Sequence, residues 1–145
     1  MNKLTMLTTA ALCGLSSTHA NDITEVPAFD TLLDRLVREA AATTTLSRGN
    51  SLSATHQLLA GNNAANLIVQ TDGNMVLYAG TAGRGDVLWA SDTAGQGDAG
   101  THLVMQNDGN LVLYTGQQKV LWATNSNSGS RLVMQNDCNL VLYND

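Results

Sequence analysis

The sequence predicts an all-β fold from about residue 45 to the C-terminus. Short apolar runs alternate with loops rich in Gly, Asn, Ser and Thr, and one polar motif occurs three times. Aromatic residues (4%) and charged residues (13%) are sparse. This composition is typical of short strands joined by turns rather than of a helical bundle. At 145 residues, the chain has about the length of one domain.

The motif Gln-x-Asp-x-Asn-x-Val-x-Tyr forms the end of an internal repeat of twelve residues. The three copies of the repeat lie at residues 67–78, 103–114 and 132–143. Two copies are followed by a second recurring segment, Val-Leu-Trp-Ala-Ser/Thr, at residues 87–91 and 120–124. Before the first copy, leucines between Gly and Asn indicate two shorter strands, around Leu52 and around Leu58 and Leu59.

Each copy of the motif is predicted to form a hairpin. As one straight strand, residues 70–78 would span roughly 26 Å, whereas Asn-Asp-Gly between two apolar runs is a strong turn signal. A three-residue loop, 107–109, places Gln106 opposite Asn110. The Gln, Asn, Val and Tyr side chains then share one face, and the alternate leucines and methionines form the core. In the third copy Cys138 takes the position of the loop glycine, where a left-handed conformation strains a side chain by about 1 kcal/mol or more.

The shared face of each hairpin carries a carboxylate, two amides, a phenol and one apolar side chain. Neighbouring sugar hydroxyls both donate and accept, and these groups supply both functions. A single copy would be explained better by a solvated strand face and turn residues than by a binding site. A solvated face does not require the same four polar residue types in register three times, so the repeat predicts carbohydrate binding.

The three motifs, with the Trp-containing segments between them, resemble the monocot mannose-binding (bulb-type) lectin family from about Leu46 to Asp145. The resemblance implies a β-prism II of three four-stranded antiparallel sheets with pseudo-threefold symmetry. It also implies metal-independent binding of α-D-mannose and mannose-containing glycans, without a cofactor. The tryptophans that fill the prism axis correspond to Trp89 and Trp122.

The mannose-binding residues of the family map onto five positions in each copy. In every copy the Gln, Asp, Asn and Tyr would hydrogen-bond the sugar, and the Val would contact its ring. These residues are Gln70, Asp72, Asn74, Val76 and Tyr78; Gln106, Asp108, Asn110, Val112 and Tyr114; and Gln135, Asp137, Asn139, Val141 and Tyr143.

The sequence departs from the family in the third copy. Family members usually continue with another Trp-containing strand, often exchanged between the subunits of a homodimer, but only two residues follow Tyr143. We therefore expect the third sheet to be one strand short, and the third site to be weakened by fraying of the chain end. Members often have a disulfide at the hairpin loop, where Cys138 lies.

Residues 1–20 have the features of a secretory signal peptide. Lys3 precedes a short apolar run, and Thr18-His19-Ala20 supplies small residues at a cleavage site. A lipoprotein signal at Cys13 is the alternative, although the bulky Leu12 precedes it. The sequence thus predicts a secreted protein in which Cys138 is the single remaining thiol and has no intramolecular partner.

Residues 21–44 form a separate N-terminal extension, and residues 45–145 the lectin domain. A helical period over about Thr31–Ala42 gives one apolar stripe, with Asp30 as the candidate N-cap. We expect this helix to pack on the domain, where it could cover the incomplete third sheet, or on a partner chain. Its polar face is not basic, which disfavours attachment to a membrane surface.

Other functions are less consistent with the sequence. A net charge of −5 and a pI near 4.9 do not fit a nucleic-acid binder, and no apolar run is long enough for membrane insertion. No nucleophile motif or paired carboxylates indicate an enzyme, and one Asp per hairpin is too few for an EF-hand calcium site. The remaining alternative is a protein-interaction or structural module on a lectin scaffold with decayed sugar sites.

Overall fold

The computed structural model describes residues 2–5, 43–81 and 85–144. These residues form twelve strands and no helix. The strands are β1 (Asn2–Thr5), β2 (Thr45–Ser47), β3 (Ser51–Ser53), β4 (Gln57–Leu59), β5 (Ala65–Val69), β6 (Met75–Ala79), β7 (Val87–Ala90), β8 (His102–Met105), β9 (Leu111–Tyr114), β10 (Val120–Ala123), β11 (Arg131–Met134) and β12 (Leu140–Asn144). Within these ranges no helix could cross a bilayer. The helix expected over about Thr31–Ala42 lies outside the described residues.

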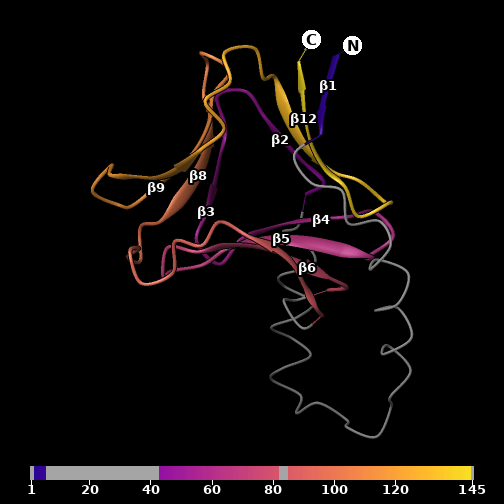
Figure 1. The fold of residues 1–145 in the computed structure, drawn as a ribbon, viewed down its shortest axis with the longest axis horizontal. Coiled ribbons are helices and arrows are strands. Elements are labelled where there is room, and N and C mark those ends of the chain that lie inside the picture. The colour runs from indigo at the N-terminus through magenta and orange to yellow at the C-terminus, as the bar shows by residue number, and fades with distance from the viewer. Residues whose placement is uncertain (1, 6–42, 82–84, 145) are drawn as a thin grey trace, which may run out of the picture.

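The strands form three four-stranded antiparallel sheets that enclose a triangular interior (Figure 1). Sheet I has the order β4-β5-β6-β7, sheet II has β10-β9-β8-β3, and sheet III has β1-β12-β11-β2. The predicted fold class, a β-prism of three sheets, is confirmed. Each sheet is built on one copy of the repeat, in the hairpins β5–β6, β8–β9 and β11–β12.

The chain before the first hairpin joins the three sheets. Its short strands β2, β3 and β4 pair with β11, β8 and β5, and so each belongs to a different sheet. The sequence predicted two short strands in this region, around Leu52 and around Leu58 and Leu59, and the structure has these as β3 and β4. It adds β2, which the sequence analysis did not separate as a strand.

The hairpins have the predicted register. Val104 pairs with Val112 and His102 with Tyr114. The Gln106 backbone N–H donates to the Asn110 backbone carbonyl at 2.9 Å. The loop is therefore the three residues 107–109. Gly109 takes a φ of +89°, and Cys138 takes +65° at the equivalent position, as predicted for a left-handed loop residue.

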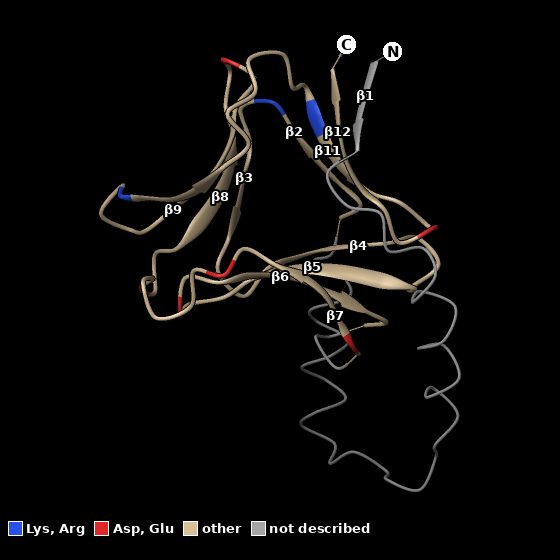
Figure 2. Cartoon of the chain, viewed as in Figure 1, with Lys and Arg blue, Asp and Glu red and all other residues tan. Residues whose placement is uncertain are grey.

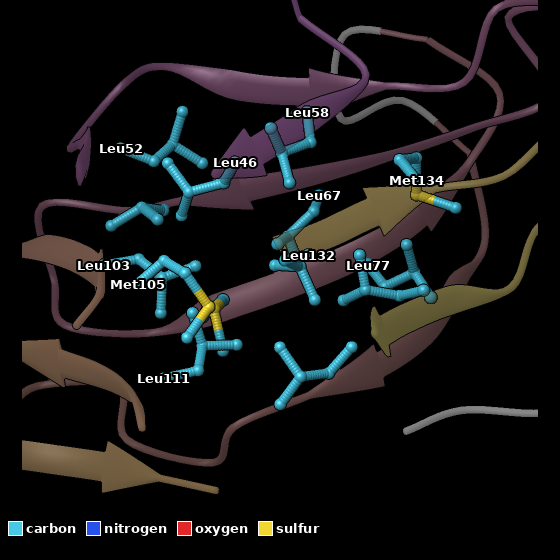
Figure 3. Close-up of a cluster of buried hydrophobic side chains, with 14 of the residues drawn as sticks. Leu46, Leu52, Leu58, Leu67, Leu77, Leu103, Met105, Leu111, Leu132 and Met134 are labelled. Atoms are coloured by element: carbon cyan, nitrogen blue, oxygen red, sulfur yellow. The ribbon is translucent and has the colours of Figure 1, made fainter. Parts of the chain in front are cut away.

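The inner faces of the sheets form one apolar core (Figure 3). Residues such as Leu67, Leu103 and Leu132, at equivalent positions in the three hairpins, are fully buried. Trp89 and Trp122 pack against this core and meet edge to face, with ring centroids 5.6 Å apart. Both tryptophans are only partly buried, so they border the core; that they fill the prism axis stays an implication of the family resemblance.

Sheet III differs from the prediction in its edge strand. It is not one strand short, because β1 pairs with the free edge of β12 from Asn2–Asn144 to Thr5–Val141, which brings the two chain ends together (Figure 1). In the uncleaved chain Cys138 is disulfide-bonded. The expectation that Cys138 has no intramolecular partner concerns the chain after removal of residues 1–20, and it stays a prediction. An open β12 edge presents unpaired N–H and C=O groups, and β1 satisfies them in the full-length chain.

Candidate carbohydrate-binding sites

The Asp of each motif caps its own hairpin loop with one carboxylate oxygen. Its Oδ1 accepts the backbone N–H of the motif Asn two residues later, at 2.8 Å in hairpin I, 2.9 Å in hairpin II and 3.1 Å in hairpin III. This local bond explains why the turn requires an Asp or Asn at that point. The exposed carboxylates of Asp72 and Asp108 keep Oδ2 without a donor from the described residues.

The motif Gln and Tyr, which are eight residues apart in sequence, meet across each hairpin. Gln70 Nε2 donates to the Tyr78 hydroxyl at 3.0 Å, Gln106 Nε2 donates to the Tyr114 hydroxyl at 2.5 Å, and Gln135 Nε2 donates to the Tyr143 hydroxyl. The Tyr oxygen is the acceptor in these bonds, so its own proton remains available to a ligand. The Gln Oε1 likewise remains available as an acceptor.

The motif valines lie in the middle of the same outer face. They are only 4%, 2% and 0% exposed for Val76, Val112 and Val141. A side chain with so little exposed surface can give a sugar ring only a small apolar contact area. The polar atoms around it must therefore supply most of the contact with a ligand.

The motif Asn is held differently in the third hairpin. Asn74 Oδ1 and Asn110 Oδ1 accept hydrogen bonds from the Ser91 and Thr124 hydroxyls, at 3.1 and 3.0 Å, just beyond β7 and β10. Asn139 instead donates through Nδ2 to Asp137 Oδ2 at 2.9 Å. The sequence analysis did not assign Ser91 and Thr124 to the site. The signal was present, because both follow the recurring Trp-Ala.

The residue opposite the motif Tyr also differs between the sheets. Asn66, opposite Tyr78, is fully buried and donates to Gln57 Oε1 at 2.9 Å. His102 stacks on Tyr114 with ring centroids 5.8 Å apart. Arg131 places its guanidinium 4.8 Å from the centroid of the Tyr143 ring. The three sites therefore share their motif and differ at its outer end.

Taken together, the first two hairpins present matched donors and acceptors on one small surface. Among the described residues, the acceptors without a partner are one Asp oxygen and the Gln Oε1, and the donors without one are the Asn Nδ2 and the Tyr hydroxyl. The structure places all five motif residues of each copy on a single hairpin, and the acidic residues that it describes lie in the loops (Figure 2). No group of three or more His, Cys, Asp or Glu within residues 43–81 and 85–144 could hold a metal ion.

Comparison with known proteins identifies the scaffold. The chain matches no family model and no curated protein. Among solved structures, it is similar to the Polygonatum cyrtonema lectin complexed with monomannoside, at 40% identity and a TM-score of 0.63, covering 71% of this chain and 91% of that one. It is also similar to the mannose-specific agglutinin from snowdrop (Galanthus nivalis) bulbs complexed with methyl-α-D-mannoside, at 34% identity and a TM-score of 0.61, covering 70% and 90%.

A third match gives the same result. The monomeric monocot mannose-binding lectins from Gastrodia elata are 38% identical, with a TM-score of 0.61, and the match covers 71% of this chain and 89% of theirs. The chain belongs to the monocot bulb-type lectin family. As a bulb-type lectin it is a non-enzymatic carbohydrate-binding protein, which agrees with the lack of catalytic motifs in the sequence.

Proposed function

We propose that this lectin binds α-D-mannose and mannose-containing glycans through the Gln-x-Asp-x-Asn-x-Val-x-Tyr sites of its three hairpins. The observation that carries the proposal is the recurrence of the same polar residues on one face of each hairpin, with the same Gln-to-Tyr bond and the same bond from the Asn backbone N–H to the Asp carboxylate. The mannosides bound to the snowdrop and Polygonatum lectins support it.

The chemistry of recognition follows from the free atoms. Two neighbouring hydroxyls on a pyranose need two acceptors and two donors, because each hydroxyl both donates and accepts. The Asp Oδ2 and Gln Oε1 accept their protons, and the Asn Nδ2 and Tyr hydroxyl donate to their oxygens. The bond to the carboxylate is charge-assisted and therefore the strongest of the four.

We further propose that no metal ion takes part in binding. Each hairpin has one motif carboxylate, already engaged through one oxygen in the turn, whereas calcium takes six to eight oxygen ligands. The single site is shallow and should bind a monosaccharide weakly. Useful affinity then comes from two or three sites engaging a branched or repetitive mannan together.

Calorimetric titration with methyl α-mannoside tests this function, with a galactoside and a chelator as controls. We expect heat from the mannoside that survives chelation and no heat from the galactoside. Absence of heat with both the mannoside and a mannan oligosaccharide would contradict the proposal. The alternative function considered from the sequence, an interaction module with decayed sugar sites, would then be favoured.

We also propose that the protein is secreted and that residues 1–20 are its signal peptide, on the evidence of the Lys3 charge, the apolar run and Ala20. Cleavage after Ala20 would remove β1 and leave the β12 edge of sheet III open. It would also remove Cys13, the other of the two cysteines in the sequence, and so leave Cys138 without an intramolecular disulfide partner. Mass spectrometry of the exported protein tests the proposal. A mature N-terminus at Asn21 supports cleavage, and an N-terminus at Met1 or Asn2 contradicts it.

A homodimer is a proposal that depends on this cleavage. Once β1 is removed, the unpaired N–H and C=O groups of β12 can pair with the same edge in a second copy. Light scattering of the full chain and of residues 21–145 tests it. We expect a dimer for residues 21–145 and a monomer for the full chain, and a monomer in both cases would contradict the proposal.

A further inference from the structure

Two hydroxyl side chains connect hairpin I to the end of its neighbouring strand. Ser91 Oγ accepts the Met75 backbone N–H at 2.9 Å and lies 3.1 Å from Asn74 Oδ1. Thr93 Oγ1 lies 2.7 Å from Ser91 Oγ and donates to the Gly73 carbonyl at 2.6 Å. The pair thus contacts the backbone on both sides of Asn74 as well as its side chain.

Hairpin II has the same arrangement on different residues. Thr124 Oγ1 accepts the Leu111 backbone N–H at 3.1 Å and lies 3.0 Å from Asn110 Oδ1. Ser126 Oγ lies 3.0 Å from Thr124 Oγ1 and donates to the Gly109 carbonyl at 2.6 Å. Ser and Thr have exchanged places between the two sheets, so the hydroxyl rather than the whole side chain is the common element.

In hairpin I a further contact determines which way the Asn74 amide points. The Thr93 backbone N–H also donates to Asn74 Oδ1, at 3.3 Å, and a backbone N–H can only donate. The oxygen of the Asn74 amide is therefore the atom turned toward the strand end. Asn74 Nδ2 consequently has no acceptor, and Asp72 Oδ2 no donor, among the described residues.

Hairpin III lacks this support among the described residues. No Ser or Thr hydroxyl there contacts Asn139, whose amide instead donates to Asp137 Oδ2. Asn139 Oδ1 is left buried without a hydrogen-bond partner. We call the candidate sites on hairpins I, II and III sites 1, 2 and 3. The Asn Nδ2 and the Asp Oδ2, which have no partner among the described residues in sites 1 and 2, bond to each other in site 3, and a ligand must break that bond.

We propose that Ser91 and Thr124 are positioning residues for the sugar sites of hairpins I and II. They act through Asn74 and Asn110, by holding Oδ1 inward and so keeping Nδ2 available to a sugar hydroxyl. The inference rests on the proposed mannose binding and deepens it, because it makes sites 1 and 2 stronger than site 3. The reason is that free groups need no rearrangement before they bind.

Site-resolved NMR titration of the full chain with methyl α-mannoside tests the inference. The backbone and side-chain amides of the three motif Asn residues report the three sites separately in one sample. In the unmodified lectin, we expect the resonances of Asn74 and Asn110 to saturate at lower mannoside concentration than those of Asn139. A third site that binds equally well or more tightly contradicts the inference.

The decisive variant is Thr124→Val, which keeps the shape of the side chain and removes the hydroxyl. We expect the affinity of site 2 to fall about tenfold, the size of one lost hydrogen bond to the ligand, while site 1 is unchanged in the same molecule. Thr124→Ser should restore the affinity and the chemical shift of the Asn110 side-chain amide. Unchanged site 2 affinity in Thr124→Val, or no rescue by Ser, overturns the inference.

Controls separate this effect from a loss of stability or of function. Thr101→Val removes a buried hydroxyl that donates to the Asp98 carbonyl at 2.7 Å, and should leave every site unchanged. If Thr124→Val does not fold, Ser91→Ala tests site 1, where we expect a smaller loss of affinity because the Thr93 backbone N–H still donates to Asn74 Oδ1. Normal mannoside binding with no effect in both variants refutes the positioning role alone, whereas no binding at any hairpin refutes the proposed function with it.

Discussion

Hairpins II and III carry nearly the same sequence, yet their loops are held by different neighbours. At Gly109, a Cβ atom would lie 2.5 Å from the Ser128 backbone nitrogen, because the loop after β10 packs directly on the hairpin. The equivalent residue of hairpin III is Cys138, whose side chain is fully buried and disulfide-bonded. A disulfide thus occupies the position at which sheet II brings two backbones into contact.

This difference shows that an identical motif does not produce an identical site. The motif sets the turn, the register and the Gln–Tyr bond in all three copies. The segment after the neighbouring strand decides the orientation of the motif Asn, and sheet III has no described counterpart of residues 91–97 or 124–129. Three copies of one motif therefore give two sites in which the motif Asn is held by a neighbouring hydroxyl and one site in which it is held by the motif Asp.

The largest expected effect is the loss of unfolding free energy when a core leucine of sheet II or sheet III is truncated. Leu113 and Leu142 are equivalent inward-facing residues and are 0% and 1% exposed. Replacing either with Ala should lower the free energy of unfolding by about 2–5 kcal/mol through lost packing and a cavity. Urea denaturation of the full chain measures both. A cost below about 1 kcal/mol for Leu142→Ala alone would show that sheet III is packed less tightly than the structure has it.

The next-largest effect tests the close backbone contact between Gly109 and the loop after β10. Gly109→Ala should cost about 2–4 kcal/mol of stability, because it combines a left-handed conformation with a steric clash. Gly95→Ala is the matched control, since its φ is +82° and a Cβ there meets nothing within 4 Å. Equal costs for the two variants in thermal or urea unfolding would mean that the backbone contact at Gly109 contributes nothing.

A smaller effect distinguishes the carboxylates of the two hairpins. Asp108→Asn keeps the side-chain oxygen that caps the turn and removes the charge, so we expect the fold to persist. The mannoside affinity of site 2 should then fall about tenfold. Asp137→Asn should change site 3 less, because Asp137 Oδ2 already accepts from Asn139. NMR titration measures both, and unchanged affinity in Asp108→Asn would refute the role given to this carboxylate.

The smallest effect is expected in β10, the edge strand beside hairpin II, whose counterpart in sheet III is β1. Val120, the first residue of β10, is 53% exposed, and Val120→Thr should change stability by less than about 0.5 kcal/mol. The same substitution at Val112, which is 2% exposed, should cost more than about 1 kcal/mol because it buries a hydroxyl. Denaturation curves that do not separate the two variants would contradict the burial of the motif valines.

Most of the fold and of the motif placement could be predicted from the sequence. The repeat, the Asn-Asp-Gly turn and the parity of the strands together set the pairing of His102 with Tyr114 and the left-handed φ at Cys138. These features are local, because each depends on residues within one hairpin. The family resemblance supplied the arrangement of three sheets, which the similarity to solved bulb-type lectins confirms.

The sequence was less informative wherever contacts connect distant segments. It did not predict that β1 completes sheet III, that Cys138 is disulfide-bonded, or that Ser91 and Thr124 contact the motif Asn. It also did not show that the motif valines are almost fully buried. Pairing of the chain ends and packing of a loop on a hairpin depend on how the three sheets close around the core, and a local pattern does not encode that closure.

The sequence by itself therefore determined the hairpin, its outward polar face and its inward leucines, because alternation along a strand fixes these within a few residues. Only the tertiary structure decided which side-chain atoms remain free for a ligand. A hydrogen bond formed across two strands removes a donor or an acceptor from the surface, and that bond exists only once the sheets are in place.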